Sequence, residues 1–139
     1  MNMLKNIGLL MVISILMTSC ILEDVEPEYD IIGAVGTISE LTASTTSPSV
    51  GQTVSFRVVF YSEHENATRL DMNRVQGSTV TNLDSRSFST WNKEDSYVET
   101  FQFVVPDGSE GSAITIQFEL FTESNFSITR SIALQVAGS

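Results

Sequence analysis

The chain has little of the residue types that disulfides and metal sites require. One cysteine, Cys20, and one histidine, His64, stand in 139 residues. A single cysteine cannot form a disulfide within the chain, so the fold has to rest on its hydrophobic core. One histidine without a second thiol also leaves a tetrahedral zinc site short of its usual ligands. The sequence therefore excludes a disulfide scaffold and argues against zinc chemistry.

Basic side chains are also scarce. Seven Lys and Arg residues stand against 17 Asp and Glu residues. Lys5 is the only charged residue before Glu23, so the part from Cys20 onward has six basic and 17 acidic residues and a formal charge of −11. Such a surface repels nucleic-acid phosphates and anionic lipid headgroups. We therefore expect no nucleic-acid partner.

The N-terminal segment has the pattern of an export signal. Lys5 precedes the apolar run "IGLLMVISILM" at residues 7–17, and the small residues Thr18 and Ser19 follow. A basic start, an apolar stretch and a small-residue cleavage site are typical of secretory signals. The run is shorter than the about 20 apolar residues that a membrane-spanning helix needs. We expect residues 1–19 to be a signal peptide in helical form.

The stretch "LMTSC", residues 16–20, resembles the lipobox of bacterial lipoproteins. That resemblance implies cleavage between Ser19 and Cys20, a diacylglycerol on the Cys20 thiol, and an N-acyl chain such as palmitate on the new amine. Met17 stands where the lipobox more often has leucine. Two or more acyl chains give stable attachment, whereas one chain anchors only marginally. An ordinary signal peptide with an incidental cysteine and a retained membrane anchor stay open as alternatives.

Residues 20–35 carry an acidic run directly behind the cysteine. Its five acidic residues are Glu23, Asp24, Glu26, Glu28 and Asp30. Like charges extend a chain and Pro27 breaks a helix, so we expect a disordered tether. The run resembles the export signal of Bacteroidota-type lipoproteins that reach the outer face of the outer membrane, which implies surface exposure. A plain solvated linker, with the protein facing the periplasm, is the alternative.

From residue 36 onward, apolar and polar residues alternate with the period of a β-strand. In "TVSFRVVFY", residues 53–61, Val54, Phe56, Val58 and Phe60 share one face. The same alternation occurs in 96–105, 113–121 and 127–136, where Arg130 interrupts it, and weaker strand patterns occupy 37–43, 68–74 and 78–83. Seven strands without an amphipathic helix predict an all-β chain with one antiparallel sandwich over residues 36–139.

The segment "FVVPDGSEGSAITIQFELFTESNFSITRSIALQV", residues 103–136, resembles the closing strands of bacterial Ig-like surface modules of the PKD and fibronectin-like kind. The resemblance covers about residues 36–137 and is one of pattern. The Cys…Trp…Cys hallmark of antibody domains is absent, since Cys20 precedes the domain. The resemblance implies an Ig-like fold with a non-catalytic binding or structural role.

Few residues combine into a pattern that indicates catalysis or metal binding. Glu63 and Glu65 flank His64, but neighbouring side chains of an extended chain point to opposite faces, which favours a solvated loop. The acidic residues beside Gly108 lack the spacing of a calcium loop, and no serine lies in a nucleophile-elbow setting. We expect no enzyme, no metal and no cofactor beyond the lipid on Cys20, with a small envelope enzyme as a distant alternative.

Three aromatic residues lie among polar ones in "RSFSTWNKEDSY", residues 86–97. Phe88, Trp91 and Tyr97 have the chemistry to stack on sugar rings or to anchor a protein partner. Alternatively, these aromatics close one end of the sandwich, or "FSTW" pairs as an edge strand. Tyr61 and Phe121 fall on outward-facing positions, which predicts an apolar patch on one sheet face.

Together these features predict a membrane-anchored envelope lipoprotein whose Ig-like domain is a non-catalytic binding or structural module. Its partner is an unidentified protein or glycan, reached at the cell surface. The alternative is a carbohydrate-binding accessory lipoprotein of a glycan-uptake system.

Overall fold

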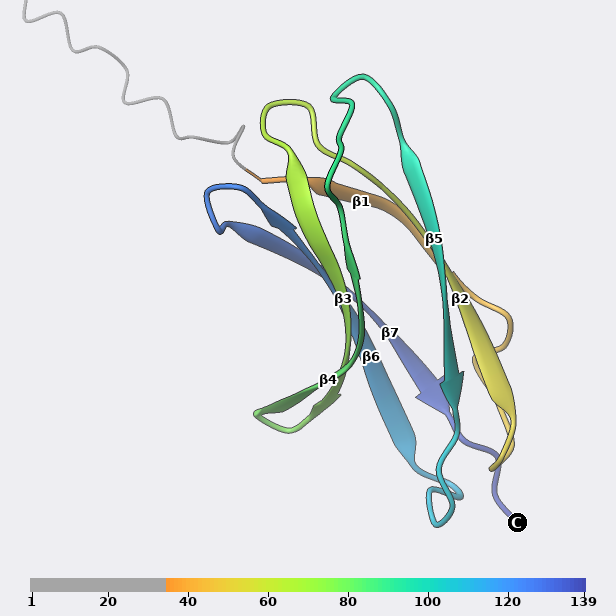
Figure 1. The fold of residues 1–139 in the computed structure, drawn as a ribbon. Helices are drawn as coiled ribbons and strands as arrows, with labels where there is room; N and C mark the ends of the chain where they lie inside the picture. Colours follow the sequence, from red (N-terminus) through yellow and green to blue (C-terminus); the bar gives the residue numbers. More distant parts are fainter. Residues whose placement is uncertain (1–34) are drawn as a thin grey trace, which may run out of the picture. The chain divides into compact units, whose positions relative to one another are not determined.

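In a computed structural model of the chain, residues 35–139 are described, and they form seven β-strands (Figure 1). The strands are β1 (Thr37–Ala43), β2 (Thr53–Tyr61), β3 (Ala67–Gln76), β4 (Thr79–Ser87), β5 (Tyr97–Val104), β6 (Ala113–Thr122) and β7 (Ser127–Gln135). Within this part of the chain, no helix is long and apolar enough to cross a membrane. The expected signal peptide, Cys20 and the acidic tether lie outside the described residues.

The strands make two sheets, one in the order β1-β2-β5 and the other in the order β4-β3-β6-β7. Every hydrogen-bonded pair of neighbours is antiparallel. The chain changes sheet between β2 and β3, between β4 and β5, and again between β5 and β6. Two such sheets packed on a common core make an Ig-like β-sandwich, and the predicted fold class is confirmed.

The core lies between the two sheets and is built from the predicted inward-facing residues. The alternate residues of β2 from Val54 to Phe60 are buried, as are those of β6 from Ile114 to Leu120. The Phe118 ring meets the rings of Phe56 and Phe101 edge-on, with centroids 5.6 and 5.2 Å apart. Such edge-to-face pairs add to the stability gained by burial. Protein side chains therefore fill the centre of the sandwich.

The strands β3 and β4 are longer than the sequence pattern indicates. β4 continues to Ser87 rather than ending at residue 83, and a bulge places Leu83 between the register positions of Asn82 and Asp84. On β3, Asp71 and Asn73 face outward yet are buried, and β4 and β6 flank this strand on both sides. Polar residues at these positions hide the alternation that marks the other strands.

Arg69 and Asn82 contact the buried polar residues of β3. The Arg69 Nε donates to the Asp71 Oδ2 at 3.0 Å and lies 2.9 Å from the Oδ1, which is buried without a hydrogen-bond partner. The Asn73 Oδ1 accepts a hydrogen bond from the Asn82 Nδ2 at 3.0 Å. These contacts offset part of the cost of removing both side chains from water.

The prediction that Tyr61 and Phe121 share an apolar patch on one sheet face is wrong. Tyr61 ends β2 in one sheet and Phe121 belongs to β6 in the other, so the two side chains lie on opposite outer faces. The Arg69 guanidinium also covers the Phe121 ring, 4.2 Å from its centroid. Alternation predicts that a side chain faces outward, but not which sheet its strand joins.

Arg130 closes the side of the sandwich where β1 and β7 lie next to each other. It stands opposite Phe118 on β6, so its side chain leaves from the inner face of the sheet. Its Nη1 donates to the carbonyl oxygens of Ile38 at 2.9 Å and Ser39 at 2.7 Å. Ser39 is the extra residue of a β-bulge in β1, and Arg130 binds the carbonyl groups of that bulge.

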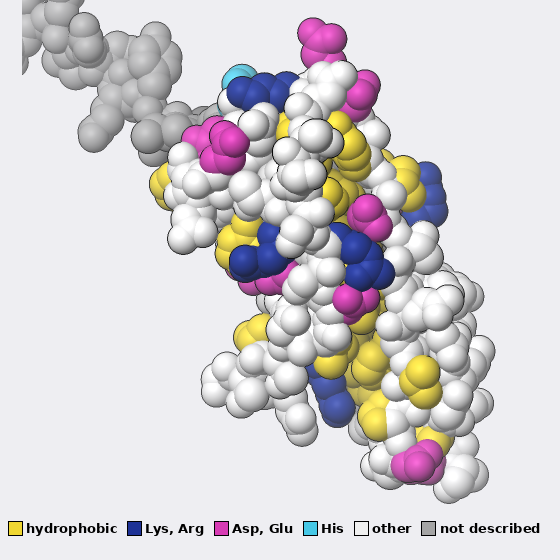
Figure 2. All heavy atoms as spheres, viewed as in Figure 1, with side chains coloured by type: hydrophobic (Ala, Val, Ile, Leu, Met, Phe, Trp, Pro, Cys, Tyr) yellow, Lys and Arg dark blue, Asp and Glu magenta, His cyan; other side chains and the backbone are white. Residues whose placement is uncertain are grey.

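Charged residues lie across the opposite side, between β4 and β5. The face in Figure 2 shows apolar side chains between the sheets with basic and acidic side chains across them. The Arg86 Nη1 donates to the Asp84 Oδ2 at 2.8 Å, and the Arg86 Nε lies 3.7 Å from the Glu99 Oε2. Its guanidinium also lies 4.6 Å from the centroid of the Phe101 ring. Arg86 thus connects the two sheets.

The chain enters and leaves the sandwich at opposite ends. Thr37 pairs with Tyr61 at one end, and Gln135 pairs with Ala113 at the other (Figure 1). At the entering end, a Cβ added to Gly36 would lie 2.6 Å from the Leu120 Cδ2, so glycine allows the chain to pass close to the core.

Candidate functional site

The end of the sandwich where the chain enters carries three loops that interact with one another. They are residues 62–66 between β2 and β3, 88–96 between β4 and β5, and 123–126 between β6 and β7. We call this region the loop end. Loops held on a rigid sandwich are a frequent place for binding residues, so their fixed geometry is of interest.

The three aromatic residues noted in the sequence come together at the loop end, on top of the core. The Trp91 ring stacks on Tyr97 with centroids 4.1 Å apart and tilts against Phe88 at 5.6 Å. All three rings contact the buried Phe60. They are half-buried, so part of each ring stays available to solvent while the rest packs as core.

Hydrogen bonds fix the position of these rings. The Trp91 Nε1 donates to the Ser62 carbonyl oxygen at 3.0 Å, and the Asn92 amide donates to the Tyr97 hydroxyl at 2.8 Å. β4 ends at Ser87, and the segment that follows keeps one backbone bond to β3, from the Phe88 amide to the Thr68 carbonyl oxygen at 2.9 Å. The segment "FSTW" is therefore an ordered loop that closes this end of the sandwich, rather than an edge strand.

A second set of bonds joins the 62–66 loop to the 123–126 hairpin. The Glu65 carboxylate accepts from the Ser124 hydroxyl at 2.6 Å and from the Ser124 amide at 3.1 Å. These hydrogen bonds from Ser124 lower the pKa of Glu65, since they favour its charged form. The Asn66 Nδ2 donates to the Glu123 Oε1 at 2.8 Å, and the Glu123 amide donates back to the Asn66 carbonyl oxygen.

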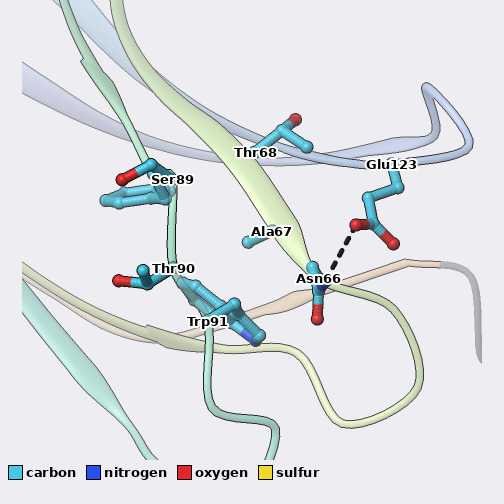
Figure 3. A pocket seen from close by; sticks show the side chains of 8 residues that line it. Asn66, Ala67, Thr68, Ser89, Thr90, Trp91 and Glu123 are labelled. Atoms are coloured by element: carbon cyan, nitrogen blue, oxygen red, sulfur yellow. Dashed lines mark hydrogen bonds between the residues drawn. The ribbon is translucent and has the colours of Figure 1, made fainter.

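Two shallow hollows lie at the loop end. The first, about 60 Å³, lies beside Trp91, and Figure 3 shows the polar side chains around it, including Thr68, Ser89 and Glu123. The second, about 120 Å³, is lined by Tyr61, the acidic residues 63, 94 and 95, Lys93 and Ser96. Pockets that enclose a drug-sized ligand measure about 300–1,000 Å³. These hollows therefore suit an inserted side chain or part of a sugar ring.

The residues considered for metal binding do not gather. His64 is exposed, and the Lys93 Nζ donates to its backbone carbonyl at 2.8 Å. Asp107 and Glu110 lie in the loop between β5 and β6, at the other end of the sandwich. In residues 35–139, no group of three or more His, Cys, Asp or Glu side chains is placed to hold a metal ion.

Four residues that connect the loops were not identified from the sequence. Glu65, Asn66, Glu123 and Ser124 form the bonds between two loops that are more than 50 positions apart in the chain. Each is a common loop residue, and no local spacing indicates its partner. Only the antiparallel pairing of β3 with β6 brings the two loops side by side.

No protein-family model and no curated protein matches the sequence. Among solved structures, the chain is similar to a Niemann-Pick type C2 protein from the Japanese carpenter ant, with a TM-score of 0.56 and 12% identity over 77% of this chain and 96% of that one. It also matches a superoxide reductase (neelaredoxin) from Ignicoccus hospitalis, with a TM-score of 0.49 and 8% identity over 73% of this chain and 81% of that one. The first likeness supports the Ig-like sandwich and, at this identity, shows the fold alone.

Proposed function

We propose that this chain is a lipid-anchored envelope protein whose Ig-like sandwich is a non-catalytic module that binds a protein partner through the loop end. The observation that carries the proposal is the set of side-chain bonds that holds loops 62–66, 88–96 and 123–126 in one arrangement. A surface that is ordered before binding loses less conformational entropy when a partner binds. The shallow hollows also suit contacts with a surface better than enclosure of a small molecule.

The position of the loop end relative to the proposed anchor supports the same function. Seventeen positions separate Cys20 from Thr37, and an extended chain spans at most about 3.3–3.6 Å per residue. A protein anchored at Cys20 therefore keeps the start of β1 within about 60 Å of the membrane. Partners attached to the same membrane lie within that reach, and confinement raises their effective concentration.

The anchor is tested by the Cys20→Ser variant. We expect the variant to leave the membrane fraction and to lose incorporation of labelled fatty acid, since the thiol that forms the thioether is gone. Ser19→Ala, which keeps a small residue before the cysteine, is the matched control and should stay membrane-bound. Incorporation of label that is unchanged in Cys20→Ser, or no incorporation in the wild-type protein, would refute the lipoprotein proposal.

The binding surface is tested with a photocrosslinking residue at Ser89 in the loop end and, as the control, at Ser78 in the turn between β3 and β4. Both positions are exposed. We expect a discrete cross-linked protein product from position 89 in intact cells and none from position 78. The same products from both positions, or none from either, would contradict binding through the loop end.

A glycan is the second candidate ligand, and the hollow beside Trp91 favours it. Amide, hydroxyl and carboxylate groups surround an indole there, and such groups bind sugar hydroxyls and sugar faces (Figure 3). Trp91 is the only tryptophan, so its fluorescence reports on this hollow directly. A saturable change on titration with surface oligosaccharides, abolished by Glu123→Ala and retained in Glu110→Ala, would identify the glycan rather than a protein as the ligand.

A further inference from the structure

The sandwich has four edge strands, and three of them are protected against pairing with another chain. Unpaired strand edges expose backbone donors and acceptors, and bulges, charges and covering loops block them. β1 has the bulge at Ser39, whose carbonyl groups bind Arg130. β4 has the bulge at Leu83. At the end of β7, the Gln135 amide already donates to the Thr46 carbonyl oxygen at 2.8 Å.

The fourth edge strand, β5, has no bulge and no charged residue on its outward face. It pairs with β2 along its whole length without a bulge, and no described strand pairs with its other side. Its outward-facing residues are Val98, Thr100, Gln102 and Val104, none of them charged. Val98 is 51% exposed and Val104 is 59% exposed, although both are large apolar residues. The only charged residue of the strand, Glu99, faces inward toward Arg86.

The backbone of these outward-facing residues points to the free edge. The Val105 amide donates to the Gln52 carbonyl oxygen across the ladder between β5 and β2. Backbone groups alternate between the two sides of a strand, so the odd-numbered residues of β5 bond β2. The amides and carbonyl groups of residues 98, 100, 102 and 104 are then directed away from β2, along an edge with no partner in residues 35–139.

We propose that β5 pairs antiparallel with β5 of a second copy of this chain, joining two three-stranded sheets into one. A two-fold axis at Phe101 places Val98 opposite Val104 of the second copy and Thr100 opposite Gln102. Apolar side chains then meet apolar ones and polar meet polar, which is what stabilises cross-strand pairs. Glu99 stands opposite Phe103 of the second copy, so no like charges face each other in this register.

This self-complementary pattern favours a second copy of the chain as the partner of the free edge of β5. The chain carries many acidic residues overall, but at physiological ionic strength charges farther apart than about 8 Å are largely screened. Edge pairing alone buries a small interface, so we expect association at high local concentration, such as on a membrane surface. The inference concerns a different surface from the loop end and does not depend on the proposed partner.

Cysteine cross-linking in the full-length protein, in the membranes of cells that express it, tests the register. Thr100→Cys and Gln102→Cys chains expressed together should form disulfide dimers on oxidation, because a bonded pair has its Cα atoms about 5.5 Å apart. Each variant alone places its cysteines two positions out of register and should form few dimers. The matched control expresses Thr100→Cys chains together with Ser55→Cys chains. Ser55 lies on β2, which is one strand, or about 4.8 Å, farther from the second copy than β5, so this pair should form few dimers.

A charge exchange separates specific pairing from chance collisions. Chains with Val98→Lys and Val104→Lys place two lysines opposite each other at both ends of the pairing, and the disulfide yield should fall about tenfold. Chains with Val98→Lys and Val104→Glu place opposite charges there and should recover the yield. Equal yields from the two double variants, or no dimers from the mixed cysteine chains, would overturn the proposal.

Discussion

At the scale of single residues, Glu65 shows how the loop end depends on ionisation. Its carboxylate is the acceptor for both the hydroxyl and the amide of Ser124, and Lys93 lies near enough to favour its negative charge. A carboxylate that accepts such bonds binds its proton less readily, so its pKa falls below the ordinary value of 4.5. The contact between the 62–66 loop and the 123–126 hairpin is therefore pH-dependent.

The sign of that dependence follows from the lowered pKa. The hydrogen bonds from Ser124 to the Glu65 carboxylate contribute fully to stability above the ordinary pKa of 4.5. This contribution is lost as pH falls through the lowered pKa of Glu65 in the folded protein. We expect the Ser124 amide to lose protection from hydrogen exchange below that pH. Glu65→Gln should have weaker protection of Ser124 that does not change over this range, and Glu63→Gln, in the same loop, should behave like the wild type. Unchanged protection of Ser124 in acid would contradict this account.

The sequence identified the aromatic residues of the site but not how they are used. Phe88, Trp91 and Tyr97 stand out because large aromatic residues are unusual in a polar stretch. The Trp91 indole donates to the carbonyl oxygen of Ser62, which lies in another loop. No local sequence pattern predicts that the two loops meet. The same holds for the bonds of Glu65 to Ser124, which join two loops that only the pairing of β3 with β6 brings together.

At the scale of secondary structure, regular alternation decided how well each strand could be predicted. The bounds of β1 and β2 agree with the sequence pattern, Thr37–Ala43 and Thr53–Tyr61. β3 and β4 run further than predicted, because polar residues occupy covered positions of β3 and a bulge interrupts the period of β4. Alternation reports burial, so it fails where a polar side chain is buried with a partner or where the register shifts.

Arg130 determines whether β1 stays attached to β7. We expect Arg130→Ala to destabilise the domain by about 2 kcal/mol, because hydrogen bonds to charged groups contribute about 1.5–3 kcal/mol and two carbonyl groups of β1 lose their donor. Hydrogen exchange should rise first in β1. Arg57→Ala, which removes an exposed ion pair with Glu40, is the control and should cost less than about 1 kcal/mol. Equal unfolding free energies for the two variants in urea would contradict this role of Arg130.

At the scale of the whole molecule, the fold class was predictable and the sheet partners were not. Seven alternating segments separated by turn residues indicate a sandwich, since each buried face needs a second layer. Which strands share a sheet depends on crossovers that the sequence does not mark. The error about Tyr61 and Phe121 arose there, because both face outward but on different sheets.

Phe118 connects the two layers, because its ring contacts Phe56 and Phe101 across the core. We expect Phe118→Ala to cost about 3–5 kcal/mol, the usual range for removing a buried phenylalanine ring. Urea unfolding followed by Trp91 fluorescence measures the loss. Phe126→Ala, at a site that is 49% exposed, should change the free energy of unfolding by less than about 0.5 kcal/mol. A similar loss for both variants would show that the core does not depend on this ring.

The opposite placement of the two ends of the sandwich determines how the domain would bear a mechanical load. A force applied between Thr37 and Gln135 runs nearly parallel to the strands, since β1 starts at one end and β7 finishes at the other (Figure 1). The ladders between β1 and β2 and between β6 and β7 are then sheared, so their hydrogen bonds are loaded together instead of opening one after another. A protein held at one terminus and pulled at the other would resist extension through the combined strength of these ladders and the Arg130 bonds to β1.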